Sequence, residues 1–159
     1  MENVMRVADY IASRYQRDYG LEIDEMKLHK LMYFAQKESI IQTGEPLFDA
    51  VFYGWKYGPV LKEIRGVFMS EDTFPCTNPN VDEFGESFQG IMDRVFSDYA
   101  QKTSWSLSRL THGETSWKHS REGIPDGESG DNSISLDLIR KDAEALKARR
   151  KALAEFGIS

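Results

Sequence analysis

Hydrophobic residues at the N-terminal end of the sequence recur at steps of three and four positions. Val4, Val7, Ile11 and Tyr15 therefore lie on one stripe of a predicted helix. Gly20 is expected to end this helix, because glycine adopts the left-handed conformation that closes helices at little cost. The first predicted element is an amphipathic helix that packs through a single face.

A second helix is predicted from Asp24, a suitable N-cap, to about Thr43. Its apolar side chains, which include Leu28, Leu31 and Phe34, spread around more than one face. A helix that is apolar on several sides is buried on several sides. We therefore expect this helix to lie at the centre of the domain.

The sequence Gly44-Glu45-Pro46 interrupts the helical pattern, and residues 50–57 are rich in aromatic and β-branched side chains. This composition predicts a short extended segment, with a helix as the competing interpretation. Gly58-Pro59 follows, and proline suits the first turn of a helix. We therefore expect a third helix to begin there, with Val60, Ile64 and Phe68 on its core face.

The fold class predicted for residues 1–159 is a compact, mainly α single domain of about seven helices with one short extended segment near residues 50–57. The fourth helix contains Gly85 and Gly90, each of which costs about 1 kcal/mol relative to alanine, so packing must stabilise it. The near-heptad spacing of apolar residues in the last helix, capped by Ser133 or Ser135, is compatible with a homo-oligomer. The later elements are predicted as a loop over 70–82, a helix over 84–99, short helices over 104–110 and 116–122 that begin at capping residues, a polar loop over 123–133, and a final helix at about 135–156.

The charge balance narrows the classes of partner. Twenty Lys and Arg residues against 26 Asp and Glu residues give a net charge of −6, which disfavours nucleic acid and anionic membrane and favours a basic partner. Neither a membrane span nor a signal peptide is visible, which predicts a cytoplasmic protein. The single cysteine, Cys76, excludes an internal disulfide and a cysteine cluster for zinc.

Motifs with known catalytic mechanics are absent: there is no phosphate loop, dinucleotide fingerprint, Gly-x-Ser-x-Gly elbow or His-Glu-x-x-His. His112, Glu114 and His119 are close in sequence, but the spacing of the two histidines fits no usual metal site. Cys76 with His112 as a base has no sequence feature in its favour, and a histidine at a helix end more often caps the helix. We expect no enzyme activity, no metal and no cofactor, although a hydrolase or transferase that uses His112 remains a rival.

Four aromatic residues fall outside the helical stripes: Trp55, Tyr57, Trp105 and Trp117. Each is either a core residue or an anchor for another protein, because aromatic residues are enriched in both places. If several converge on one surface, they would form the desolvated centre of a protein interface.

Basic residues crowd the last predicted helix, and a rival interpretation makes it a recognition helix for DNA. Asp137, Asp142, Glu144 and Glu155 interleave with the basic residues, which favours a solvated helix face. The basic residues are Arg140, Lys141, Lys147, Arg149, Arg150 and Lys151.

An ordered set of motifs resembles the Panacea domain, the SocA-like and GepA-like family of bacterial and phage proteins. The resemblance runs from about Val4 to Ile139. The motifs are Met26-Lys27-Leu28-His29-Lys30-Leu31-Met32-Tyr33-Phe34-Ala35-Gln36, Gly44-Glu45-Pro46-Leu47-Phe48, Trp55-Lys56-Tyr57-Gly58-Pro59-Val60, and Leu107-Ser108-Arg109-Leu110-Thr111-His112 with Trp117.

The resemblance implies a helical antitoxin that neutralises a cognate toxin, encoded beside it, by direct binding. Some members instead act as adaptors that deliver the toxin to a processive protease such as a Clp-type machine. Others carry an added N-terminal DNA-binding domain, which we do not expect here because the first predicted helix starts at about Val4.

The expected toxin-binding surface is the rigid turn of Trp55, Tyr57, Gly58 and Pro59, with His112 and Trp117 nearby. An acidic rim of Glu45, Asp49, Glu114 and Glu122 is expected to speed encounter with a basic toxin. The residues expected to build the structural framework are Lys27, Leu28, Lys30, Leu31, Tyr33 and Thr111.

Overall fold

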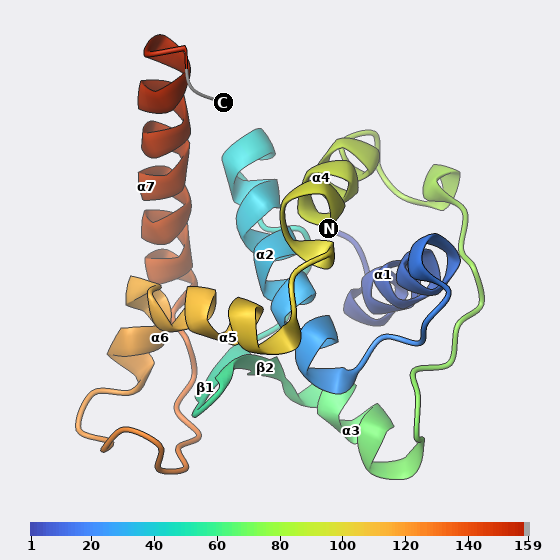
Figure 1. Ribbon diagram of the computed structural model, residues 1–159, viewed down its shortest axis with the longest axis horizontal. Helices are drawn as coiled ribbons and strands as arrows, with labels where there is room; N and C mark the ends of the chain where they lie inside the picture. The colour runs from blue at the N-terminus through green and yellow to red at the C-terminus, as the bar shows by residue number, and fades with distance from the viewer. Residues whose placement is uncertain (158–159) are drawn as a thin grey trace.

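The computed structural model describes residues 1–157 and is mainly helical, as predicted (Figure 1). A single two-stranded antiparallel sheet accompanies the helices in this part of the chain. The elements in order are α1 (Val4–Tyr19), α2 (Glu25–Thr43), β1 (Phe52–Trp55), β2 (Gly58–Leu61), α3 (Lys62–Ser70), the 3-10 helix η1 (Val81–Glu83), α4 (Phe88–Val95), the π-helix η2 (Phe96–Ala100), α5 (Ser104–His112), α6 (Thr115–Ser120) and α7 (Leu136–Glu155).

Helix α2 is the centre of the fold. It packs against α1, α3, α4, α5, α7 and strand β2. Leu28, Leu31, Met32 and Tyr33 on this helix are completely buried. Figure 1 shows α2 between α1 and α4 on one side and α7 on the other. The apolar residues that spread around α2 predicted this central position.

The first two helices begin and end as the sequence predicts. The side chain of Asp24 accepts a hydrogen bond from the amide of Lys27 at 2.8 Å and caps α2. Asn3 caps α1 in the same way. Gly20 and Gly44 follow the two helices in the left-handed conformation.

The third helix was predicted to begin at Gly58-Pro59, which is wrong. Residues Gly58–Leu61 form strand β2, which pairs with β1, and the helix begins at Lys62. The amide of Leu61 donates to Nδ1 of His29 at 3.1 Å, so α2 satisfies the backbone at the end of the strand. Pairing with a neighbouring strand therefore outweighs the preference of proline for a first helical turn.

The fourth helix was predicted over 84–99 and is shorter and irregular. Phe84 stacks on Phe88 at 3.9 Å before the helix begins, and the amide of Gly85 donates to the carboxylate of Glu2 at 2.9 Å. The amide of Gly85 is thus bonded to a side chain near the N-terminus and not to the carbonyl four residues before it, as it would be in an α-helix. After Val95 the helix widens into η2, whose last carbonyl, that of Ala100, accepts a hydrogen bond from Lys27.

The short C-terminal helices differ from prediction mainly at their caps. Thr103 and Glu114 occupy the N-cap positions of α5 and α6, in place of Ser104 and Ser116. Ser135 caps α7. The first half of α7 buries Ile139 and Ala143, and the second half extends past the end of α2 (Figure 1). None of the helices within residues 1–157 has both the length and the apolar character needed to cross a bilayer.

Gln36 holds the segment between α2 and β1. Its side chain is buried, its Oε1 accepts from the amides of Leu47 and Phe48 at 2.8 and 3.2 Å, and its Nε2 donates to the carbonyl of Phe48 at 2.9 Å. One glutamine side chain therefore satisfies three backbone groups in the interior. Leaving such groups without partners costs the full free energy of their desolvation.

We predict that Gln36→Leu lowers the free energy of unfolding by about 2–4 kcal/mol, because three buried backbone groups lose their partner. The matched control is Gln16→Leu on α1, at an exposed position whose side chain makes no hydrogen bond within residues 1–157, with an expected change below about 0.5 kcal/mol. Urea unfolding monitored by circular dichroism measures both. Equal losses for the two variants would contradict the role of Gln36.

Candidate partner-binding site

The predicted turn is the tip of the β-hairpin. Trp55 pairs with Gly58, and Lys56 and Tyr57 form the two-residue turn between the strands. Gly58 has a φ of +117°, which side-chain-bearing residues rarely adopt. A Cβ atom there would lie 2.5 Å from Oγ1 of Thr111 and 2.7 Å from Cε of Lys30. Glycine is therefore required by both the backbone and its neighbours.

Helices α5 and α6 fix the hairpin tip by hydrogen bonds to its carbonyls. The Ser108 hydroxyl donates to the carbonyl of Tyr57 at 2.6 Å, and Nε1 of Trp117 donates to the carbonyl of Trp55 at 2.8 Å. Thr111, fully buried, donates to the carbonyl of Ser108 at 2.7 Å. The turn is thus held from two helices that lie about 50 to 60 residues further along the sequence.

Two aromatic pairs gather around this tip. His112 stacks on Trp117 with ring centroids 4.2 Å apart, and Tyr57 meets Trp105 edge to face at 5.3 Å. Burial lowers the pKa of His112. Tyr57 and Trp105 are 44% and 58% exposed, which is unusual for side chains of this size. The expected residues therefore lie together, and Trp105, not included in the expected surface, joins them.

Lys30 lies under the turn and is 1% exposed. Its Nζ donates to the carbonyl of Pro59 at 3.3 Å. Burial lowers the pKa of Lys30 to about 7, although Glu25 and Asp24 oppose the shift. A buried ammonium group with one long hydrogen bond is costly to keep in a folded protein.

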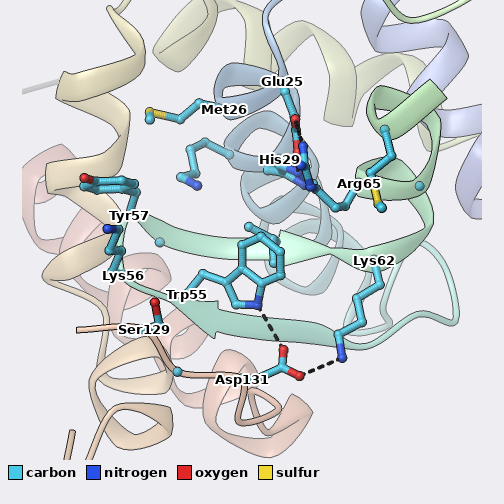
Figure 2. Close-up of a pocket in the computed structure, with 16 residues that line it drawn as sticks. Glu25, Met26, His29, Trp55, Lys56, Tyr57, Lys62, Arg65, Ser129 and Asp131 are labelled. Carbon is cyan, nitrogen blue, oxygen red and sulfur yellow. Dashed lines mark hydrogen bonds and ion pairs between the residues drawn. The ribbon is translucent and has the colours of Figure 1, made fainter. Parts of the chain in front are cut away.

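A cavity of about 1090 Å³ adjoins the turn, between the hairpin, the start of α2, helix α3 and residues 129–131. Figure 2 shows Lys56 and Tyr57 at one side of it, Lys62 and Arg65 at the other, and the Trp55 ring between them. Four cationic and two carboxylate side chains line it, a formal excess of two positive charges. The cations are Lys30, Lys56, Lys62 and Arg65, and the carboxylates are Glu25 and Asp131.

Both carboxylates of the cavity have partners. Glu25 accepts from Arg65 at 2.6 Å and from Nε2 of His29 at 3.0 Å. Burial would raise the pKa of Glu25, but His29 and Arg65 lower it. Because Nδ1 of His29 accepts the Leu61 amide, its Nε2 carries the hydrogen and His29 is neutral, in keeping with the pKa that burial lowers.

Asp131, in the segment 129–131 that lines the cavity, joins this segment to the hairpin and to α3. It accepts from Nε1 of Trp55 at 3.0 Å and from Lys62 at 2.9 Å (Figure 2). These contacts lower the pKa of Asp131, with the bond from Trp55 as the largest cause. Sequence reasoning missed Asp131, because nothing in a polar loop indicates which side chain returns to the hairpin.

The residues expected to form the framework have different positions. Leu28, Leu31 and Tyr33 are fully buried, and the Tyr33 hydroxyl shares a hydrogen bond with Ser116 at 2.8 Å. Lys27 donates to the Tyr15 hydroxyl at 3.2 Å and to the carbonyl of Ala100 at 3.1 Å, which joins α2 to α1 and η2. Lys30 and Thr111, in contrast, meet at Gly58 beside the cavity.

The expected acidic rim requires a correction at Glu114. This side chain is only 14% exposed and is ion-paired with Lys37. Burial raises the pKa of Glu114, and Lys37 opposes that shift. Glu114 therefore neutralises a cation of α2 and presents no charge to solvent, whereas Glu45, Asp49 and Glu122 are exposed.

The weaker candidates for chemistry lie apart. Within residues 1–157 no group of three His, Cys, Asp or Glu side chains is close enough to hold a metal ion. His119 instead pairs with Glu122 at 3.1 Å. Burial raises the pKa of the Cys76 thiol, which disfavours the nucleophilic thiolate, and the adjoining Thr77 bonds to Asp9 on α1.

Some of the basic residues of α7 are ion-paired within the fold. Arg150 lies 2.9 Å from a carboxylate oxygen of Glu38 and 3.5 Å from one of Asp98. Arg140 donates to the carbonyl of Gly44 at 2.8 Å and pairs with Glu45. These contacts join α7 to α2 and η2. Other basic residues of α7, among them Lys141, Lys147 and Arg149, are exposed to solvent.

We predict that Gly58→Ala destabilises the protein by about 2–4 kcal/mol, since the new Cβ would collide with Thr111 and Lys30 in a strained backbone conformation. Gly127→Ala is the matched control, because Gly127 also has positive φ but has no atom within 4 Å of the added Cβ. Its expected cost is about 1 kcal/mol. Thermal unfolding compares the two, and similar melting temperatures would refute the close approach at Gly58.

We predict that Lys30→Met raises the free energy of unfolding at pH 7 by roughly 1–3 kcal/mol. The pKa of Lys30 is about 7 when folded and 10.5 when unfolded, so the unfolded chain binds more protons between these values. The penalty of Lys30 therefore grows as pH falls from 10.5 to 7. The stability difference between wild type and variant should shrink from pH 7 to pH 9.5 in urea titrations, and a constant difference would contradict the shift.

Comparison with known proteins places these residues in a family. The profile of the family described as "Antitoxin SocA-like, Panacea domain" matches residues 28–118, more than half of the chain. The matched region contains the hairpin, its supports on α5 and α6, and Lys30.

A curated relative is the Antitoxin SocA of Caulobacter vibrioides (strain NA1000 / CB15N), 40% identical over 40 residues, which are 25% of this chain and 21% of that protein. The match thus spans about a fifth of the relative's length. No solved structure matches significantly. On the extent of the profile match, and as its motifs predicted, the chain belongs to the Antitoxin SocA-like, Panacea domain family.

Proposed function

We propose that the chain is an antitoxin that neutralises a cognate toxin, encoded beside it, by direct protein binding at the hairpin tip. The binding residues are Trp55, Tyr57, Gly58, Pro59, His112 and Trp117, together with Trp105. In this proposal the protein makes and breaks no covalent bond. Its membership of a family named for an antitoxin supports the proposal.

The exposed pair of Tyr57 and Trp105 is the observation that carries the proposal. Two large aromatic side chains in contact with each other are left in solvent. Tyr57 lies on a turn whose backbone is fixed by Ser108 and Trp117, and Trp105 lies on α5. Rigid aromatic anchors lose little conformational entropy on binding. Such residues supply most of the binding energy in protein interfaces.

The other proposed residues act mainly by holding these anchors. Gly58 and Pro59 are buried and fix the course of the turn, and Trp117 bonds the carbonyl of Trp55. Trp55 and His112 are partly buried. We therefore expect the binding energy to lie in Tyr57 and Trp105, and folding to depend more on the remaining residues.

Adaptor function, in which the chain delivers the toxin to a protease, uses the same binding surface. The two mechanisms differ in the fate of the toxin. A toxin whose cellular half-life is unchanged by the chain is inhibited by occupancy, and a shortened half-life indicates delivery for degradation.

We predict that Tyr57→Ala with Trp105→Ala weakens toxin binding by at least about thirtyfold, since two anchors are removed. The toxin is the growth-inhibiting product of the neighbouring reading frame, and growth rescue and calorimetry measure the effect. Circular dichroism should show intact folding, because both side chains lie largely in solvent.

The matched control is Tyr19→Ala, another exposed tyrosine that contacts an aromatic neighbour, Tyr15, but on α1. It should rescue growth as well as wild type does. Full rescue by the double variant would place the binding surface elsewhere. A neighbouring product that the wild-type chain fails to neutralise would overturn the proposed function itself.

A further inference from the structure

The geometry points to the cavity beside the hairpin as a docking site for an acidic, apolar peptide segment of the partner, with a Glu or Asp side chain of that segment bound by Lys30. This inference deepens the proposed function and rests on it for the identity of the partner. It adds a second subsite to the aromatic tip: a pocket that receives one carboxylate.

The charge of the cavity supports an anionic occupant. The chain as a whole carries −6, yet the cavity has two more cations than carboxylates. Glu25 and Asp131 are already bonded to Arg65 and Lys62. Lys30 and Lys56 have no carboxylate within ion-pair distance anywhere in residues 1–157, so the formal excess of positive charge is theirs. Burial lowers the pKa of Lys30 to about 7, and a bound carboxylate would favour its protonated form.

Lys30 is the side chain that a bound carboxylate would change most. Its ammonium group has three hydrogens, and the structure gives it one acceptor, the carbonyl of Pro59 at 3.3 Å. It is 1% exposed, so water supplies almost no compensation. A carboxylate on an apolar peptide segment would be shielded from water when bound. It would then make a charge-assisted hydrogen bond with Lys30, which is stronger than a bond between neutral groups.

The remaining walls fit a peptide. Trp55, Tyr57, Val60 and Met69 give the cavity an apolar lining, and it adjoins the exposed pair of Tyr57 and Trp105. Its volume of about 1090 Å³ accommodates several side chains. Lys30 and Tyr57 both line the cavity, and Tyr57 is exposed, so its side chain can change rotamer when a partner binds, as is common at interfaces.

A phosphate chain fits this cavity less well than a peptide. Nucleic acid is bound through several solvent-accessible cations along a surface. Here Lys30, which has no ion-pair partner among the described residues, is buried, and two carboxylates, Glu25 and Asp131, also line the cavity. Because these carboxylates already occupy Arg65 and Lys62, the described part of the chain gives the cavity too few free cations for a phosphate chain but enough for a single carboxylate.

The first experiment selects random peptides, about a dozen residues long and displayed without a free C-terminus, on the purified full chain. We expect enrichment of Glu or Asp next to aromatic or aliphatic residues. The enrichment should disappear on Lys30→Met, which we expect to fold. It should persist on Lys147→Met, which removes the same charge from an exposed position on α7 outside the cavity.

A double-mutant cycle then tests the contact directly. A selected peptide, synthesised with an amidated C-terminus, and its Glu→Gln or Asp→Asn form are titrated against wild type and Lys30→Met. Each single change should weaken binding at least about tenfold, and the second change should add little, because both remove the same interaction. Additive losses would overturn the inference.

Three other results would also overturn it. The first is that no acidic peptide is selected. The second is that the enrichment survives Lys30→Met. The third is a short oligonucleotide that binds wild type but not Lys30→Met while no acidic peptide does, which would assign the cavity to phosphate.

The outcomes for the cavity and for the antitoxin function can be separated. If Lys30→Met rescues growth as well as wild type does, the carboxylate subsite is refuted and the antitoxin proposal stands. If the wild-type chain fails to rescue growth but its binding of acidic peptides still depends on Lys30, the subsite stands and the toxin is not its occupant.

Discussion

The structure depends on the burial of helix α2 on all sides, which requires a partner for every polar side chain that the helix carries inward. Gln36 satisfies three backbone groups of the following segment, Lys27 bonds η2 and α1, and Lys37 pairs with Glu114. Buried polar groups are tolerated only when they are bonded. The helices around α2 are therefore fixed by specific hydrogen bonds as well as by apolar packing, and Lys30, with one long bond, is the least satisfied member of this set.

Lys30 also links the core to the candidate site. It packs against Gly58, whose missing side chain lets the hairpin approach α2 and Thr111 closely. The hairpin tip is thus a rigid platform built on the central helix, with two aromatic residues left in solvent. In the proposed function, the buried Lys30 beside the cavity is part of a binding site that gives up some stability for binding.

The charge pattern refines the view of the partner. The composition favours a basic partner, and Glu45, Asp49 and Glu122 remain exposed to attract one. The cavity has the opposite sign, since its carboxylates are neutralised internally by Arg65 and Lys62. A partner that is basic overall and inserts one acidic, apolar segment would match both regions, and such a mixed requirement gives specificity as well as affinity.

Local spacing and ordered motifs were enough to predict the helical class, the central position of α2, the capping residues Asp24, Gly20 and Gly44, and the family. The motifs also predicted that Trp55, Tyr57, His112 and Trp117 belong to one binding surface. The local pattern could not predict that Gly58–Leu61 is a strand, that Glu114 is ion-paired with Lys37, or that Asp131 bonds to Trp55. Each of these features depends on contacts between residues that are far apart in sequence, and the local pattern does not record such contacts. The free energies of strand pairing and burial at these contacts exceed the local conformational preferences.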